Sequence, residues 1–227
     1  MEEYINQLIF GVFPYIAGSV FLLGSLLRYE RGQYTWRAMS SQTLNNTRAF
    51  RVGSVMFHVS ILLLFFGHLF GLLTPTEVYT SFGLTTAMKQ NLSMVAGGTF
   101  GAICFIGMTI LIWRRLFNPR VRANSAHMDT FIILLLYFQL ITGMFSIFWS
   151  MEDHDGSVMV QLANWAQSIV TFQAGAWEHV VDVHWIYKLH MFLGLIMFTA
   201  FPFSRLVHIW SWPWGYFRRA YQVVRMR

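Results

Sequence analysis

Cysteine and lysine are almost absent from this chain of 227 residues, which has one cysteine, Cys104, and two lysines. A single cysteine excludes an intramolecular disulfide and an iron–sulfur cluster built by this chain alone. The sequence has no C-x-x-C-H motif, which excludes a covalently attached c-type haem. Glu2 and Glu3 precede the first apolar run, where a signal peptide has a basic segment. We therefore expect the first run to be a retained span.

Long apolar runs are what the sequence has instead: 56% of its residues are apolar, 18% are aromatic and only 11% are charged. Each run has about 20 residues, enough to cross a bilayer core of roughly 30 Å. No repeat, low-complexity tract or linker divides the chain. We predict an all-α polytopic membrane bundle in which residues 1–227 form a single unit. Its five transmembrane helices are expected at about 8–27, 52–73, 92–113, 130–149 and 185–209.

The basic residues predict the orientation of the bundle. All arginines fall in three segments, at positions 28, 31, 37, 48 and 51, then 114, 115, 120 and 122, then 205, 218, 219, 225 and 227. With five spans these segments lie on one side, and the positive-inside rule makes that side cytoplasmic. The N-terminus is then outside and the C-terminus inside. The loop 150–184 agrees, because it has five acidic residues and no lysine or arginine. A membrane thus explains the net charge of +6, and we expect no nucleic-acid partner.

Within that outer loop, apolar residues recur at helical spacing, namely Leu162, Trp165, Ala166, Ile169 and Val170. This pattern predicts a short amphipathic helix at about 160–172, at the outer interface. Either it roofs a ligand site or it simply packs at the interface, and simple packing is the commoner case.

Four histidines stand inside two of the apolar runs. His58 and His68 are ten residues apart in the second run, which corresponds to roughly 15 Å along a helix. His190 and His208 are eighteen apart in the fifth, which is five whole helical turns, so we expect them to share one helix face at a separation of roughly 27 Å. Because the two spans run in opposite directions, His58 matches the depth of His208 near the cytoplasm, and His68 matches His190 near the outside. Imidazole in hydrocarbon needs a partner, and two such pairs predict two bis-histidine b-type haem sites.

The two separations differ by roughly 12 Å, which straight parallel helices do not accommodate. Pro202 is expected to bend or loosen the fifth helix and to absorb part of this difference. A haem-free transporter that uses its histidines as a proton relay is the alternative. The remaining histidines lie in loops or at a span edge and are assigned no ligand role: His127, His154, His179 and His184.

Small and basic residues near these histidines each allow two interpretations. Ser54, Gly67, Gly71 and Gly194 suit either a flat macrocycle or helix contact, whereas Gly97, Gly98, Gly101 and Gly107 favour close helix packing. Arg48, Arg51 and Arg205 either pair with haem propionates or anchor the cytoplasmic side. Lys89, at the outer edge of the third span, either hydrogen-bonds a quinol oxygen or extends to the lipid headgroups.

Several stretches resemble one known family. They are PYIAG, LRYERGQYTWRAMSSQ, FHVSILLLFFGHLFGLLTP, RRLFNPRVRA, WAQSIVTF, FPFSRLVHIWS and YQVVR, and together they span nearly the whole chain. The chain resembles the gamma subunit, a dihaem cytochrome b, of the membrane-bound respiratory nitrate reductases.

The resemblance implies a subunit of the cytoplasmic (inner) membrane that oxidises menaquinol or ubiquinol on its outer side. Electrons would pass through two b haems to an iron–sulfur beta subunit, and a molybdenum-containing alpha subunit on the cytoplasmic face would reduce nitrate. Carried over by position, His68 and His190 would ligate the distal haem, His58 and His208 the proximal haem, and Lys89 would belong to the quinol site. The alternative is a cytochrome b subunit of another oxidoreductase, of sulfite-reduction or heterodisulfide type.

This chain departs from the family pattern at three places. Lys188 stands where arginine is common, one extra residue precedes Lys89, and the loop 173–184 differs. The departures concern the shape of the quinol pocket and the choice of quinone, and they leave the four histidines intact.

Overall fold

The computed structural model describes residues 2–36, 47–211 and 218, and in this part of the chain every regular element is a helix. Five helical segments are long and apolar enough to cross a membrane, which confirms the predicted number of spans. The first combines α1 (Glu2–Asn6), the π-helical η1 (Gln7–Val12) and α2 (Phe13–Arg31); the others are α3 (Arg48–Leu73), α5 (Thr86–Phe117), α7 (His127–Ser150) and α9 (Trp185–Ala200).

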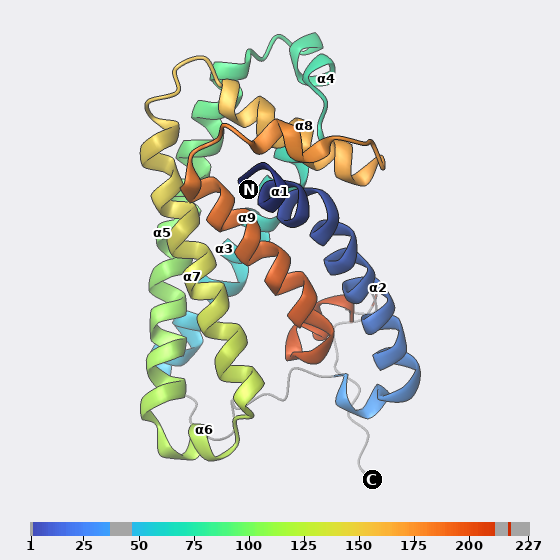
Figure 1. Cartoon of the computed structure of the whole chain (residues 1–227). Helices are drawn as coiled ribbons and strands as arrows, with labels where there is room; N and C mark the ends of the chain where they lie inside the picture. The colour runs from blue at the N-terminus through green and yellow to red at the C-terminus, as the bar shows by residue number, and fades with distance from the viewer. Residues whose placement is uncertain (1, 37–46, 212–217, 219–227) are drawn as a thin grey trace.

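Shorter elements gather at the two ends of the bundle. Figure 1 shows α4 (Thr76–Ser81), α8 (Ser157–Val170) and the N-terminus at one end, and α6 (Pro119–Ala123) at the other. The remaining short elements are η2 (Gln33–Thr35), η3 (Ala176–Val180), η4 (Phe201–Phe203) and η5 (Arg205–Trp210). The amphipathic helix predicted in the outer loop is α8, and it packs inward: its Val158, Leu162 and Trp165 contact a buried cluster that includes Phe10 and Val180.

Polar caps set where the spans begin. The side chain of Thr47 accepts a hydrogen bond from the backbone N–H of Phe50, and Thr85 does the same for Met88, both at 3.2 Å. Each cap satisfies an amide that has no partner within the helix. The helices therefore extend beyond the apolar runs that predicted them, and α5 begins at Thr86 where the run begins at about 92.

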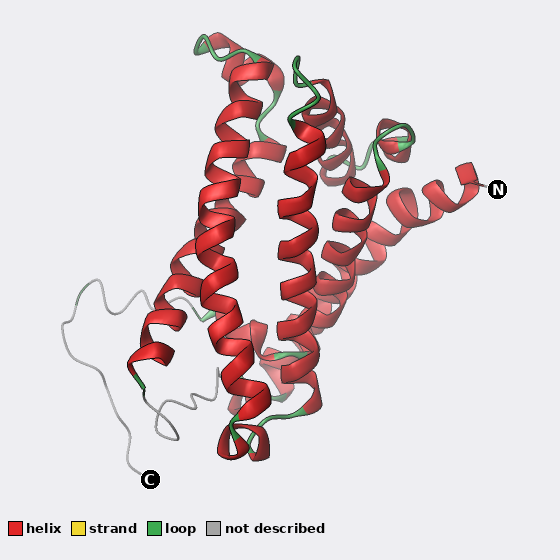
Figure 2. Cartoon of the chain, turned by 90° about the vertical axis from the view of Figure 1, so that its left-hand side faces the viewer, coloured by secondary structure: helices red, strands yellow, loops and turns green. Residues whose placement is uncertain are grey.

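The long helices pack in the order α3, α5, α7, α9 and α2. Figure 1 labels these helices, and Figure 2 shows the bundle turned by 90°. The closest approach joins α3 to α5, where a Cβ on Gly107 would lie 2.7 Å from the backbone nitrogen of Phe57. A Cβ on Gly101 would lie 3.2 Å from Met144 of α7. The predicted packing role is confirmed for both glycines, whereas a Cβ on Gly97 would have no atom within 4 Å.

The fifth span differs from the prediction. The expected helix over 185–209 ends as an α-helix at Ala200, and two short 3-10 helices follow, separated by Ser204 in an extended conformation (φ −110°, ψ 176°). Pro202 lacks the N–H that a continuous helix needs, so the predicted loosening is confirmed. The expectation that His190 and His208 share one helix face, five turns apart, is wrong because no continuous helix joins them.

Candidate functional site

The rings of His68 in α3 and His190 in α9 lie close together. Their ring centroids lie 6.0 Å apart, with the ring planes at 34°. Metal–imidazole bonds are about 2 Å long, so two imidazoles that hold one ion from opposite sides have ring centres roughly 6 Å apart. Among the described residues, no group of three or more His, Cys, Asp or Glu is placed to hold a metal ion. Two histidines alone could hold a haem, which would bring its remaining iron ligands with it.

Three of the four candidate ligand histidines donate a hydrogen bond from Nδ1 to a backbone carbonyl. Nδ1–H of His58 donates to the Ser54 carbonyl at 2.7 Å, and that of His68 donates to the Leu64 carbonyl at 2.7 Å. In η5, Nδ1–H of His208 donates to the Arg205 carbonyl at 2.5 Å. With the proton held on Nδ1, the lone pair is on Nε2, the atom that binds a metal. The side chains of His58 and His68 are exposed.

His190 has different partners, and both belong to α7. Its Nδ1 lies 3.1 Å from the hydroxyl of Thr142, and its Nε2 lies 3.2 Å from the side-chain nitrogen of Gln139. The ring sits so close to α7 that a Cβ on Gly143 would be 2.8 Å from its Cε1. Gln139 Oε1 is buried without a hydrogen-bond partner in the described structure, so one hydrogen bond, about 1 kcal/mol, holds the amide at Nε2. Iron at Nε2 would replace that bond.

His58 and His208 are not brought together in the same way. The ring contact of His58 is with Phe57, at 4.9 Å between centroids. The elements that carry the two histidines do share one end of the molecule, since η5 and the start of α3 both lie in the lower half of Figure 1. The break after Ala200 explains the difference, because the position of His208 depends on tertiary contacts of η4 and η5.

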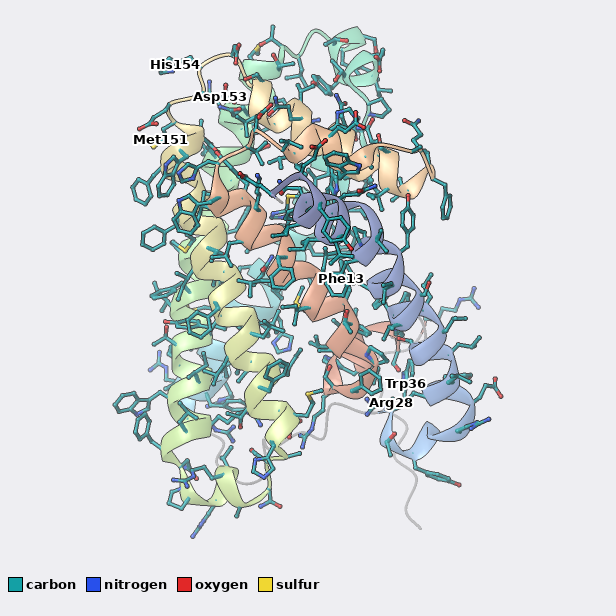
Figure 3. The ribbon with its side chains drawn as sticks, viewed as in Figure 1. Phe13, Arg28, Trp36, Met151, Asp153 and His154 are labelled. Carbon is teal, nitrogen blue, oxygen red and sulfur yellow. The ribbon has the colours of Figure 1, made fainter. Side chains whose placement is uncertain are left out.

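Arg28 of α2 makes the first of these contacts. Its Nη1 donates to the carbonyl oxygens of Pro202 and Ser204, each at 2.6 Å. Both carbonyls lie shortly after the end of α9 at Ala200, where the α-helical hydrogen-bond pattern is interrupted. A Cβ on Gly24, one turn away on α2, would lie 2.8 Å from Pro202 Cγ, so the absence of a side chain allows this approach. Figure 3 shows Arg28 beside Trp36 at the lower end of α2.

Asp129 of α7 makes the second contact. Its carboxylate lies 2.5 Å from Arg205 and 3.8 Å from Arg115, and its side chain is only 5% exposed. It also accepts a hydrogen bond from the backbone N–H of Ala126. Arg205, for which the sequence allows either a propionate or an anchoring role, thus has a protein carboxylate as a partner. Arg48 and Arg51 are exposed in the first turn of α3.

Lys89 is buried near the start of α5. Its ammonium lies 4.0 Å from the centroid of the Tyr79 ring in α4, an arrangement typical of a cation–π contact. Lys89 is 9% exposed and Tyr79 is 6% exposed, so this lysine does not reach outward from the bundle. Tyr79 was not singled out from the sequence. The sequence does contain one indication of its role. Tyr79 precedes the turn at Gly83, and this turn leads the chain back toward Lys89 at the start of α5.

Helix α8 lies across the end of the bundle where α3 ends and α5 begins (Figure 1). The side-chain amide of Gln167 donates to the Leu72 carbonyl at 2.9 Å, one turn beyond His68. The loop that precedes α8 accepts a hydrogen bond from Thr86 at the Asp155 carbonyl, at 2.8 Å. Asp153 and His154 lie in this loop at the upper end of Figure 3. The end of the bundle that holds Lys89 and His68 is therefore covered by α8.

Two of the histidines without a predicted ligand role have structural partners. His184 caps α9 by accepting from the backbone N–H of Ile186 at 3.4 Å, and its ring stacks on Trp149. Nε2 of His179 lies 3.5 Å from the hydroxyl of Ser168. These contacts explain both residues without a haem.

Five long apolar helices, with the rings of His68 and His190 close together between two of them, define a multi-pass helical membrane protein. A family model described as the nitrate reductase gamma subunit matches residues 6–227. The chain belongs to this family, the gamma subunits of respiratory nitrate reductases, which are parts of an oxidoreductase complex.

Curated relatives agree with the family match. The chain is 48% identical to the respiratory nitrate reductase 1 gamma chain of Escherichia coli over 99% of both chains. It is 49% identical to the respiratory nitrate reductase 2 gamma chain of that organism over 100% of both. A more distant relative, 25% identical over 90% of this chain and 59% of its own length, is the Hdr-like menaquinol oxidoreductase cytochrome b-like subunit of Archaeoglobus profundus.

Proposed function

We propose that the whole chain acts as one dihaem cytochrome b unit, which oxidises quinol and passes the electrons to the iron–sulfur subunit of a respiratory nitrate reductase. The observation that carries the proposal is the 6.0 Å separation of the His68 and His190 rings, which suits one metal ion between them. The family supports the nitrate reductase complex, and the distant relative's name supports a b-type cytochrome and a quinol donor. His58 and His208 would hold the second, inner haem.

The orientation proposed is that of the positive-inside rule. Arginines at the ends of α2 and α5, at the start of α3, in α6 and in η5 all lie at the end of the bundle that contains α6. We place this end in the cytoplasm, with the N-terminus and α8 outside. Arg37 and the last arginines, at 219, 225 and 227, lie outside the described residues.

Quinol would bind at the outer end, near Lys89 and His68. Oxidation of one quinol releases two electrons and two protons, and bound haems would supply the one-electron acceptors that the electrons need. The Lys89 ammonium, held over Tyr79, would donate a hydrogen bond to a quinol oxygen and make loss of its proton easier. Helix α8 covers this end and would limit the access of water to the reacting oxygens.

Protons released outside and electrons delivered inside separate charge across the membrane. Each elementary charge moved against 100 mV stores about 2.3 kcal/mol. The iron–sulfur beta subunit and the molybdenum-containing alpha subunit would dock at the cytoplasmic end, where Arg120 and Arg122 of α6 are exposed. Nitrate reduction would then take place on the alpha subunit.

An optical spectrum of the assembled complex, reduced minus oxidised, tests the proposal together with a haem assay. We expect b-type bands and two non-covalent haems for each copy of this chain, reducible by menaquinol or ubiquinol analogues. A complex without these bands would favour the haem-free proton relay and overturn the proposal.

A further inference from the structure

The Nδ1 partners of the four histidines are not equivalent. His58, His68 and His208 each donate to a backbone carbonyl of their own helix. His190 is the exception within the described structure, because its Nδ1 partner is a side chain from another helix, the Thr142 hydroxyl of α7. No substitution removes a backbone carbonyl, whereas a single substitution removes this hydroxyl.

The hydroxyl proton of Thr142 is already donated in a hydrogen bond within α7. It is donated to the Gln139 carbonyl at 3.0 Å, the bond that a threonine often makes within its own helix. The Thr142 oxygen is therefore left as an acceptor for Nδ1–H of His190. Thr142 is 8% exposed, so water does not readily take its place as a partner.

The neighbouring residue makes this contact possible. Gly143 has no side chain to meet the imidazole, and a Cβ there would lie 3.3 Å from Nδ1 itself. Thr142 and Gly143 together form the surface of α7 that contacts the His190 ring. The Thr142 hydroxyl orients the ring, and the lack of a side chain at Gly143 leaves space for it.

We propose that Thr142 is a positioning residue of the outer haem: it fixes the tautomer and orientation of His190 and lowers the reduction potential of that haem. The inference rests on the proposed function, since it assumes that His190 binds iron. A hydrogen bond accepted from Nδ1–H makes the imidazole a stronger donor, which stabilises ferric iron more than ferrous iron. Loss of the hydroxyl should therefore raise the potential of the outer haem alone.

Redox titration of the assembled complex, with haem content measured in parallel, tests the inference in the variants Thr142→Val and Thr142→Ser. Valine keeps the shape and removes the acceptor, so we expect an upward shift of one haem potential and none in the other. Serine keeps the hydroxyl and should keep the wild-type potential. Thr199→Val is the matched control, because its hydroxyl bonds the Leu195 carbonyl of its own helix.

An unchanged outer potential in Thr142→Val, or an equal shift in the valine and serine variants, overturns the inference. If Thr142→Val loses both haems, Thr142→Cys decides in its place, because a thiol accepts hydrogen bonds only weakly. His190→Ala separates this failure from that of the proposed function. Retention of both haems in His190→Ala contradicts the proposed function, whereas loss of one haem there, with no shift in Thr142→Val, contradicts only the role of Thr142.

Discussion

The rings of His68 and His190 lie 6.0 Å apart although they belong to α3 and α9, which are not neighbours in the packing order of the bundle. Helices α5 and α7 link them: α3 packs along α5, α5 along α7, and α7 supports the ring of His190. The distance between the two rings thus depends on the fit of every helix in between.

The tightest point in that series is Gly107, and substituting it should disturb the histidines of α3. In Gly107→Ala, the new Cβ would lie 2.7 Å from Phe57 N and 2.8 Å from Gly53 O. Both are backbone atoms, which cannot move away by a change of side-chain rotamer. Overpacking of this kind costs roughly 1–3 kcal/mol. We expect lower thermal stability and reduced haem content. Gly97→Ala, whose Cβ has no atom within 4 Å, is the control, and an equal loss in both variants would count against helix contact as the cause.

Removal of Lys89 should slow quinol oxidation without loss of haem. In Lys89→Ala we expect both haems to remain, and their reduction by a quinol analogue to slow by roughly a hundredfold, the lower end of what a positioned proton-transfer group contributes. Electron flow from a soluble donor that reaches the partner subunits directly should stay near the wild-type rate. Ser81→Ala, an exposed hydroxyl on α4, is the control. Equal quinol-dependent haem reduction in Lys89→Ala and the wild type would remove this lysine from the quinol site.

Asp129 should matter for the inner haem and little for the outer one. Asp129→Asn removes the charge that holds Arg205 at the start of η5, the element that carries His208. A hydrogen bond between charged groups contributes roughly 1.5–3 kcal/mol, and we expect selective loss of inner-haem occupancy in the optical spectrum. Glu30→Gln changes another carboxylate at the same end, an exposed one, and serves as control. Equal loss of both haems in Asp129→Asn would show a general effect on folding.

The orientation can be tested with reporter fusions. Reporters placed after Arg122 and at the C-terminus should report the cytoplasm, and one inserted within 152–160 should report the outside. An externally active reporter at the C-terminus would contradict five spans with the N-terminus outside.

The spans and the outer amphipathic helix were predictable because apolar runs and helical spacing are local properties of the sequence. The matched depths of His68 and His190 also followed from spacing, once the spans were known to run in opposite directions. The end of α9 at Ala200 was predictable only as a loosening at Pro202.

What the sequence did not predict depends on contacts between distant residues. The path after Pro202 is held by Arg28 from the first span and by Asp129 from the fourth. The burial of Lys89 depends on Tyr79 across the turn at Gly83, and the orientation of the His190 ring depends on Thr142. In the sequence alone each of these residues has an ordinary local explanation, so none of them stands out. Arg28 reads as a basic anchor, Asp129 as a carboxylate in the first turn of a helix, Tyr79 as an interfacial aromatic and Thr142 as a hydroxyl within a span.

The most direct test of the central claim is redox titration of the haem spectra in four single variants: His58→Ala, His68→Ala, His190→Ala and His208→Ala. We predict that the His68 and His190 variants lose one and the same spectral component, and that the His58 and His208 variants lose the other. Loss of the same component in His58→Ala and His68→Ala would contradict the pairing, and retention of both components in any of the four would contradict the assignment of that histidine as a ligand.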